Sequence, residues 1–149
     1  MSLRRKGREL AVQILYQWDI HHDTAGWLED FWEQNKTHAE VRTFADDLIQ
    51  GVIAHADELD ELLGRYAEHW TVHRMAITDR TVLRVALYEL LYRPDIPARV
   101  TLNEAIDTVK LFGDEQSGSF VNGILDRILR EESRLQSKAR EAAQSVAHD

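Results

Sequence analysis

The chain has 149 residues, is 44% hydrophobic and 30% charged, and carries a formal net charge of −8. This balance is typical of one globular domain with a buried core. With 0 Cys, the sequence excludes disulfides, thiolate-bound zinc, iron–sulfur clusters and a thiol nucleophile. No apolar run approaches the roughly 20 residues of a membrane span. The charged N-terminus has no apolar stretch behind it, so we expect a cytoplasmic protein without membrane contact.

Positive charge is concentrated at the N-terminus. The first ten residues contain four cations against one anion, a local charge of +3, while 14 cations and 25 anions elsewhere give −11. A cationic patch on an acidic body repels polyanions everywhere except at that patch, so it predicts a short nucleic-acid contact. A solvated arm without a partner is the alternative that charge alone leaves open. The four cations are Arg4, Arg5, Lys6 and Arg8.

Apolar residues recur every three to four positions along nearly the whole chain. This period predicts an all-α fold, a single compact domain of about seven helices. The first helix has an apolar stripe over 10–18, and continuing it backwards places the basic residues in its first turns. A second, shorter helix is predicted at 27–33. The next pattern, at 37–66, is longer than most globular helices, so we expect a break near Gly51 or His55.

Capping signals predict where three helices begin. Thr37 with Glu40, and Thr101 with Glu104, fit the capping box, in which two side chains bond free N–H groups of a first turn. Thr78 fits the N-cap of the helix between these two signals. These positions therefore predict three helix starts.

The C-terminal third is predicted to hold two helices and a tail. Gly113 is expected to end one helix, and a polar turn over 114–119 leads into the last helix at Phe120. Large apolar residues then nearly vanish. We therefore expect the domain to span 1–130 and a frayed helix or disordered tail to occupy 131–149.

The sequence contains no recognisable catalytic or metal-binding motif. His69 and His73 would share a helix face, but the stretch has neither the Glu of a metalloprotease motif nor a third ligand. It also has no Gly-rich phosphate loop and no nucleophile elbow. We therefore predict no enzyme activity, no cofactor and no metal.

Three segments carry a resemblance to a known family. They are RRKGRELAVQILYQWD at 4–19, DRTVLRVALYEL at 79–90 and VTLNEAIDTVKLFGDEQSGSFVNGILDRIL at 100–129. In their order, spacing and residues these segments resemble the NusB family of bacterial transcription antitermination factors. The resemblance covers 4–130, although 23–72 matches only as a helical pattern.

The resemblance implies two small helical bundles packed into one unit that acts as a non-catalytic adaptor. It implies that the protein pairs with NusE, a ribosomal protein of the small subunit. The pair would hold boxA, a single-stranded RNA element of ribosomal RNA leaders. It would then join the RNA polymerase elongation complex with other Nus factors and support passage through terminators. Whether the protein also forms a homodimer is not decided by the sequence.

The resemblance also implies which residues act. The N-terminal cations would contact phosphates, two residues further along that helix would offer a base-edge hydrogen bond and a stacking face, and the turn entering the last helix would complete the RNA site. The family often has an acid at position 116 and a base at 119, and this chain has neither. The predicted RNA-binding residues are Arg4, Arg5, Lys6, Arg8, Gln13, Tyr16, Gln116, Ser119 and Phe120.

The NusE surface is implied to lie mainly on the helix that begins near 79, and the acidic body would steer a basic ribosomal protein toward it. Core packing remains the alternative for Tyr16, Phe120 and Tyr88. The predicted partner-binding residues are Asp79, Arg80, Arg84, Tyr88 and Glu89.

Two other functions stay open. Some ribosomal RNA cytosine methyltransferases carry an N-terminal domain that resembles NusB, but no βαβ pattern and no Cys follow here before Asp149. In the other alternative the chain is a protein-only interaction module whose basic residues contact no RNA.

Overall fold

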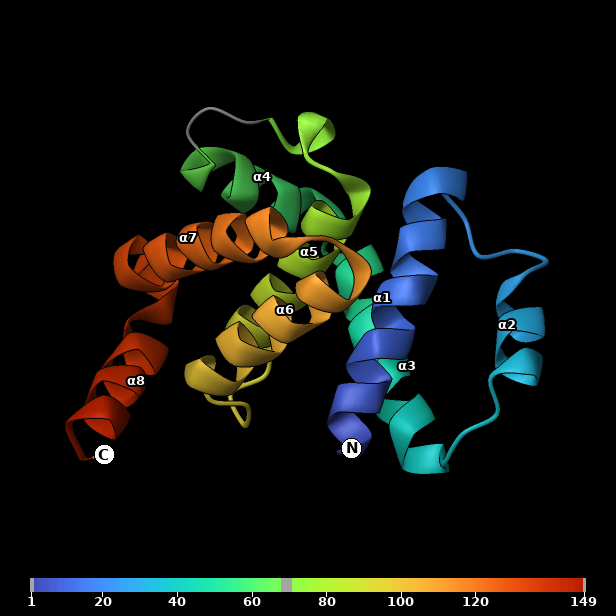
Figure 1. The fold of residues 1–149 in the computed structure, drawn as a ribbon, viewed down its shortest axis with the longest axis horizontal. Coiled ribbons are helices and arrows are strands. Elements are labelled where there is room, and N and C mark those ends of the chain that lie inside the picture. Colours follow the sequence, from blue (N-terminus) through green and yellow to red (C-terminus); the bar gives the residue numbers. More distant parts are fainter. Residues whose placement is uncertain (1, 68–70, 149) are drawn as a thin grey trace.

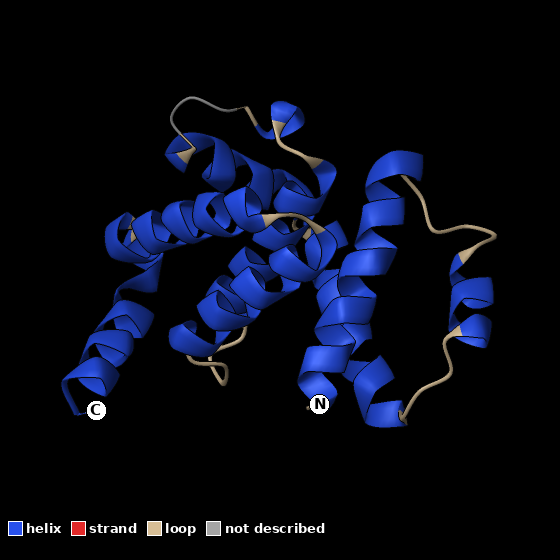
Figure 2. Ribbon diagram, viewed as in Figure 1, coloured by secondary structure: helices blue, strands red, loops and turns tan. Residues whose placement is uncertain are grey.

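The computed structural model describes residues 2–67 and 71–148, and the regular structure within these ranges is entirely helical (Figures 1 and 2). The predicted all-α fold is therefore confirmed. None of the described helices is long and apolar enough to cross a membrane. His69 lies outside the described residues. The elements are α1 Leu3–His21, α2 Leu28–Gln34, α3 Ala39–Ala54, α4 Ala56–Tyr66, η1 Val72–Arg74, α5 Ile77–Tyr92, α6 Ala98–Phe112, α7 Glu115–Glu131, η2 Ser133–Leu135 and α8 Gln136–His148.

Helix α5 lies at the centre of the fold, and every residue from 81 to 90 is buried. A helix that is buried on all sides must be covered by neighbours on every face. α1 and α3 pack against each other on one side of α5, α6 and α7 pack against each other on another, and both pairs also contact α5 (Figure 1). Two small helical bundles therefore share one central helix.

The predicted Thr101–Glu104 capping box is wrong, because α6 begins at Ala98. Thr101 lies one turn inside the helix, and its hydroxyl donates to the Glu89 carboxylate of α5. Glu104 accepts a hydrogen bond from Arg5 of α1. Contacts between helices thus use the two side chains that the local pattern assigns to capping.

Two other helix starts also differ from the capping signals. α3 begins after His38 rather than Thr37, and α5 begins after Ala76 rather than Thr78. Neither observed N-cap side chain makes a capping hydrogen bond. The break expected within the long third pattern is confirmed at His55, which lies between α3 and α4.

The segment between α6 and α7 is a short turn. Gly113 ends α6, as predicted, and a Cβ there would lie 2.8 Å from the carbonyl oxygen of Val109. The Asp114 carboxylate accepts a hydrogen bond from the Ser117 N–H at 2.8 Å and caps α7. The predicted polar turn over 114–119 is therefore wrong, since most of these residues form the first turn of α7.

The segment 131–149, expected to be a frayed helix or disordered tail, instead folds back onto the domain in its described part. α8 packs against α6 and α7, and Leu135 just before it is buried. The buried Lys138 ammonium donates to the carbonyl oxygens of Glu89 at 2.9 Å and Arg93 at 2.7 Å. One lysine thus binds carbonyl groups at the C-terminal end of α5, where a positive charge is favourable.

Candidate RNA interface

The basic N-terminal residues lie in the first two turns of α1, as predicted, but they differ in what they contact. Arg4 pairs with Asp95 at 3.1 Å, and Arg5 pairs with Glu104 at 3.0 Å. The hydrogen bond to Glu104 raises the pKa of the Arg5 guanidinium. Both arginine side chains remain well exposed, and Lys6 is exposed without an ion pair to any residue in the described ranges. These three cations form the N-terminal basic edge.

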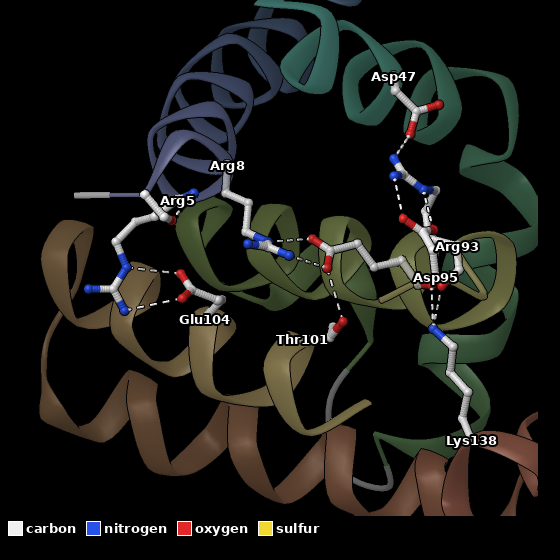
Figure 3. A network of polar contacts seen from close by, with 10 residues as sticks. Arg5, Arg8, Asp47, Arg93, Asp95, Thr101, Glu104 and Lys138 are labelled. Carbon is white, nitrogen blue, oxygen red and sulfur yellow. Dashed lines mark hydrogen bonds and ion pairs between the residues drawn. The ribbon is translucent and has the colours of Figure 1, made fainter. Parts of the chain in front are cut away.

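Arg8 is not available to RNA, so its predicted RNA contact is wrong. It is only 4% exposed and donates two hydrogen bonds to the Glu89 carboxylate, at 2.8 and 2.9 Å. Figure 3 shows Arg8 pointing from α1 toward α5, whereas Arg5 reaches Glu104 on α6. Position 8 lies four residues before Val12 and seven before Leu15, which are both buried, so Arg8 lies on the core stripe of α1.

Of the five residues predicted to contact NusE from α5, four are buried, so the prediction is wrong for these four. Arg84 donates to Asp19 of α1 at 2.8 Å and to Asp60 of α4 at 2.7 and 2.9 Å. The Arg80 side chain is 14% exposed and also bonds Asp19, so its contact with NusE stays a prediction. α5 uses its charged side chains to join helices. The four buried residues are Asp79, Arg84, Tyr88 and Glu89.

A groove of about 770 Å³ lies between α1 and α2, and we call it the α1–α2 groove. Gln13 and Tyr16 both line it, so the structure brings these two predicted RNA-binding residues together. α2 and the last turn of α6 provide the other walls. The remaining lining residues are Val12, Gln17, His21, Trp27, Asp30, Phe31, Gln34, Thr78 and Phe112.

A second hollow of about 360 Å³ lies between the start of α5 and the start of α7, and we call it the α5–α7 hollow. Gln116 and Phe120 line it, whereas Ser119 is exposed outside it. Thr78, which lines the α1–α2 groove, and Asp79, which lines the hollow, are consecutive residues of α5. The predicted RNA residues of α1 and α7 thus border two neighbouring depressions.

Asp79, which the sequence analysis placed on the NusE surface, lines this hollow. It is buried, and its Oδ1 atom has no hydrogen-bond partner within the described chain. Burial raises the pKa of the carboxyl group; a hydrogen bond with Ser117 opposes this rise, and the nearby Asp114 adds to it. The Oδ1 atom is shielded from solvent, so it has no open surface to offer to a ligand.

We expect Asp79→Asn to raise the free energy of unfolding near neutral pH by about 1 kcal/mol, because an uncompensated buried carboxylate is destabilising. The folded state raises the pKa of Asp79, so this penalty is fully present above the raised pKa and disappears as the pH falls toward the ordinary pKa of about 3.9. Urea unfolding at neutral and acidic pH checks both points. A variant that is less stable than the wild type at neutral pH would contradict this prediction.

Comparison with known proteins identifies the family. Residues 5–130 match the model of the NusB family. The chain belongs to the NusB family. Transcription antitermination protein NusB of Myxococcus xanthus (strain DK1622) is 47% identical over 133 residues, which cover 86% of this chain and 95% of the relative. The match to the NusB family ends before η2 and α8.

Solved NusB structures share the fold. T. maritima NusB is 40% identical, with a TM-score of 0.77 over 86% of this chain and 91% of the other. A crystal structure of antitermination factors NusB and NusE in complex with dsRNA contains a chain that is 27% identical, with a TM-score of 0.78 over 87% of this chain and 98% of that one. The resemblance read from the sequence is therefore confirmed.

Proposed function

We propose that this NusB-family protein is a non-catalytic, cytoplasmic adaptor of transcription antitermination. Together with NusE it binds single-stranded boxA RNA of ribosomal RNA leaders and joins the RNA polymerase elongation complex with other Nus factors. The names of its relatives and the solved complex of a similar chain with NusE and dsRNA support an RNA-binding adaptor that works with NusE. The observation that carries the proposal is that exposed cations in the first turns of α1 precede, on the same helix, two predicted RNA-binding residues that line the α1–α2 groove.

The proposed path of the RNA follows the exposed face of α1. Lys6 and Gln13 are seven residues apart, so they share one face of the helix and are separated by about 10 Å along its axis. Tyr16 lies about one turn further on, in the α1–α2 groove, and Gln116 and Phe120 lie in the α5–α7 hollow. Phosphates would contact the basic edge, and bases would contact the amides and aromatic rings.

The salt dependence of RNA binding tests the phosphate contacts. Because Arg8 is buried, three cations remain to neutralise phosphates, and the slope of log affinity against log salt should be about −2 for a single strand. Fluorescence anisotropy of labelled boxA RNA with the NusE complex, at several salt concentrations, measures this slope. A flat response would contradict the phosphate contacts. The three cations are Arg4, Arg5 and Lys6.

Removing the carboxylates that hold Arg5 should strengthen RNA binding. Arg5 pairs with both the partly buried Glu104 and the exposed Asp107. The exposed pair contributes only about 0–1 kcal/mol. We expect Glu104→Gln with Asp107→Asn to raise RNA affinity about threefold to tenfold at low salt, because the double variant frees Arg5 and removes two negative charges beside the strand.

The matched control for this double variant is Asp126→Asn with Glu131→Gln. It removes the same charge from α7, where both carboxylates pair with arginines on their own helix. We expect the control to raise RNA affinity less than the test variant does, because neither of its carboxylates pairs with a cation of the N-terminal basic edge. Equal affinities for the two double variants would show that Arg5 does not contact the strand.

A further inference from the structure

We propose that the α1–α2 groove holds one unstacked base of the bound RNA, against the rings of Tyr16 and Phe31. This inference rests on the proposed function, because the base belongs to the same strand. The groove volume of about 770 Å³ lies in the range of sites that enclose small organic molecules, so it has room for a base with its ribose.

The chemistry of the lining favours a base over other occupants. Four aromatic side chains and three glutamine amides line the groove, and stacking faces next to amides are what single-stranded RNA recognition uses. The lining contains no Lys or Arg, and it includes the Asp30 carboxylate. A phosphate would therefore be repelled, whereas the neutral, planar part of a nucleotide would not. The aromatic residues are Tyr16, Trp27, Phe31 and Phe112, and the glutamines are Gln13, Gln17 and Gln34.

The position of the groove places it on the proposed path of the strand. Gln13, on the same face of α1 as the cation Lys6, lines the groove. At the other side, Thr78 of the groove precedes Asp79, which lines the α5–α7 hollow. A strand that extends from the basic edge to the hollow therefore passes the mouth of the groove.

The two aromatic side chains at 31 and 32 in α2 have different surroundings. The anchor of α2 is Trp32, which is 5% exposed and carries the Arg42 guanidinium over its ring at 4.9 Å. Phe31 packs edge-on against Trp32, with ring centroids 5.6 Å apart, and it is the Phe31 side chain that lines the groove. Truncation of Phe31 thus removes a stacking face and part of the packing of α2, while the buried Trp32 anchor remains.

Photocrosslinking locates the base in the wild-type protein without any substitution. Single-stranded boxA RNA carrying 5-iodouridine at one pyrimidine position at a time would be bound to the complex with NusE and irradiated. We expect crosslinks from one position to peptides containing Tyr16 or Phe31. Crosslinks confined to other segments would overturn the proposal.

A thermodynamic cycle measures the contact. Phe31→Ala should weaken RNA binding about fivefold to 150-fold, the range found when a base loses its aromatic partner. An RNA with an abasic nucleotide at the crosslinked position should bind the wild-type complex more weakly by a similar factor. The same RNA should bind the Phe31→Ala complex only slightly more weakly than intact RNA does, because the free-energy effects of removing two groups that contact each other are not additive. The matched control is Leu28→Ala, which truncates an apolar side chain of α2 that does not line the groove.

The outcomes separate this proposal from the proposed function. If the wild-type complex binds boxA RNA while Phe31→Ala binds as tightly as Leu28→Ala, the groove is not a base site and the proposed function stands. If the wild-type complex does not bind RNA, both fail. Suppose that the wild-type protein self-associates and that Phe31→Ala loses this self-association while its RNA affinity is unchanged. The occupant of the groove is then a second copy of the chain, and the proposal is overturned. If Phe31→Ala does not fold, the crosslinks and the abasic RNA with wild-type protein decide.

Discussion

Arg8→Met is expected to lower the free energy of unfolding by about 3–5 kcal/mol, because it leaves the Glu89 carboxylate buried without its counterion. The Thr101 hydroxyl, which also donates to Glu89, cannot replace a charge-assisted pair of hydrogen bonds. Arg8 also lies over the Phe44 ring, at 5.2 Å from its centroid. Urea unfolding, followed by circular dichroism, measures the loss.

Two further variants show whether the buried pair is responsible. Arg4→Met removes a cation four residues earlier whose pair with Asp95 is exposed, so we expect a loss of at most about 1 kcal/mol. Adding Glu89→Met to Arg8→Met should recover part of the stability, because the uncompensated carboxylate is removed. The recovery should be incomplete, because the charge of Glu89 also favours the buried Lys138 ammonium. Wild-type stability in Arg8→Met would show that Glu89 is not held as described.

Asp19→Asn should have the second-largest effect on stability, a loss of about 2–4 kcal/mol. The Asp19 carboxylate accepts hydrogen bonds from Arg80 at 2.6 and 2.7 Å and from Arg84 at 2.8 Å, and so joins α1 to α5. Asn offers one neutral acceptor in place of these charge-assisted bonds. The side chains of all three residues are largely buried, so water replaces little of the interaction.

The effect of Asp19→Asn should depend on pH. Burial alone would raise the pKa of Asp19, but the hydrogen bond from Arg80 and the charge of Arg84 outweigh it, so the pKa is lowered. Stability from Asp19 is therefore fully present above the ordinary pKa of about 3.9 and is lost as the pH falls through the lowered folded value. The gap between wild type and variant in urea unfolding should narrow in acid. The control Asp126→Asn, in an exposed pair on α7, should show almost no gap at either pH.

The helices and their order could be predicted because the apolar period is a local signal. The break at His55 and the basic first turns of α1 follow from it. Whether each N-terminal cation is buried or exposed could not be predicted, because this depends on ion-pair partners far away in sequence. Examples are Glu89 for Arg8 and Asp95 for Arg4. For Arg8 a signal was available, since its position lies on the apolar stripe of α1.

The three segments that resemble the NusB family meet in one buried network. Arg8 comes from the first segment, Glu89 from the second and Thr101 from the third (Figure 3). The contact of Lys138 with the Glu89 carbonyl adds the C-terminal segment to this network. Some residues of these family motifs therefore join the helices. A motif alone does not distinguish such residues from those that contact RNA.

Charge reversal at Lys6 tests the central claim, that the exposed face of α1 contacts RNA, most directly. Lys6 is exposed and makes no ion pair with the described part of the chain, so Lys6→Glu leaves the fold intact. The matched control is Arg130→Glu, an exposed cation at the far end of α7. With NusE and boxA RNA, we expect Lys6→Glu to lower affinity about tenfold and to reduce the salt slope by about 0.7, while Arg130→Glu stays close to wild type. Equal affinities and equal salt slopes for the two variants would contradict an RNA contact on this face of α1.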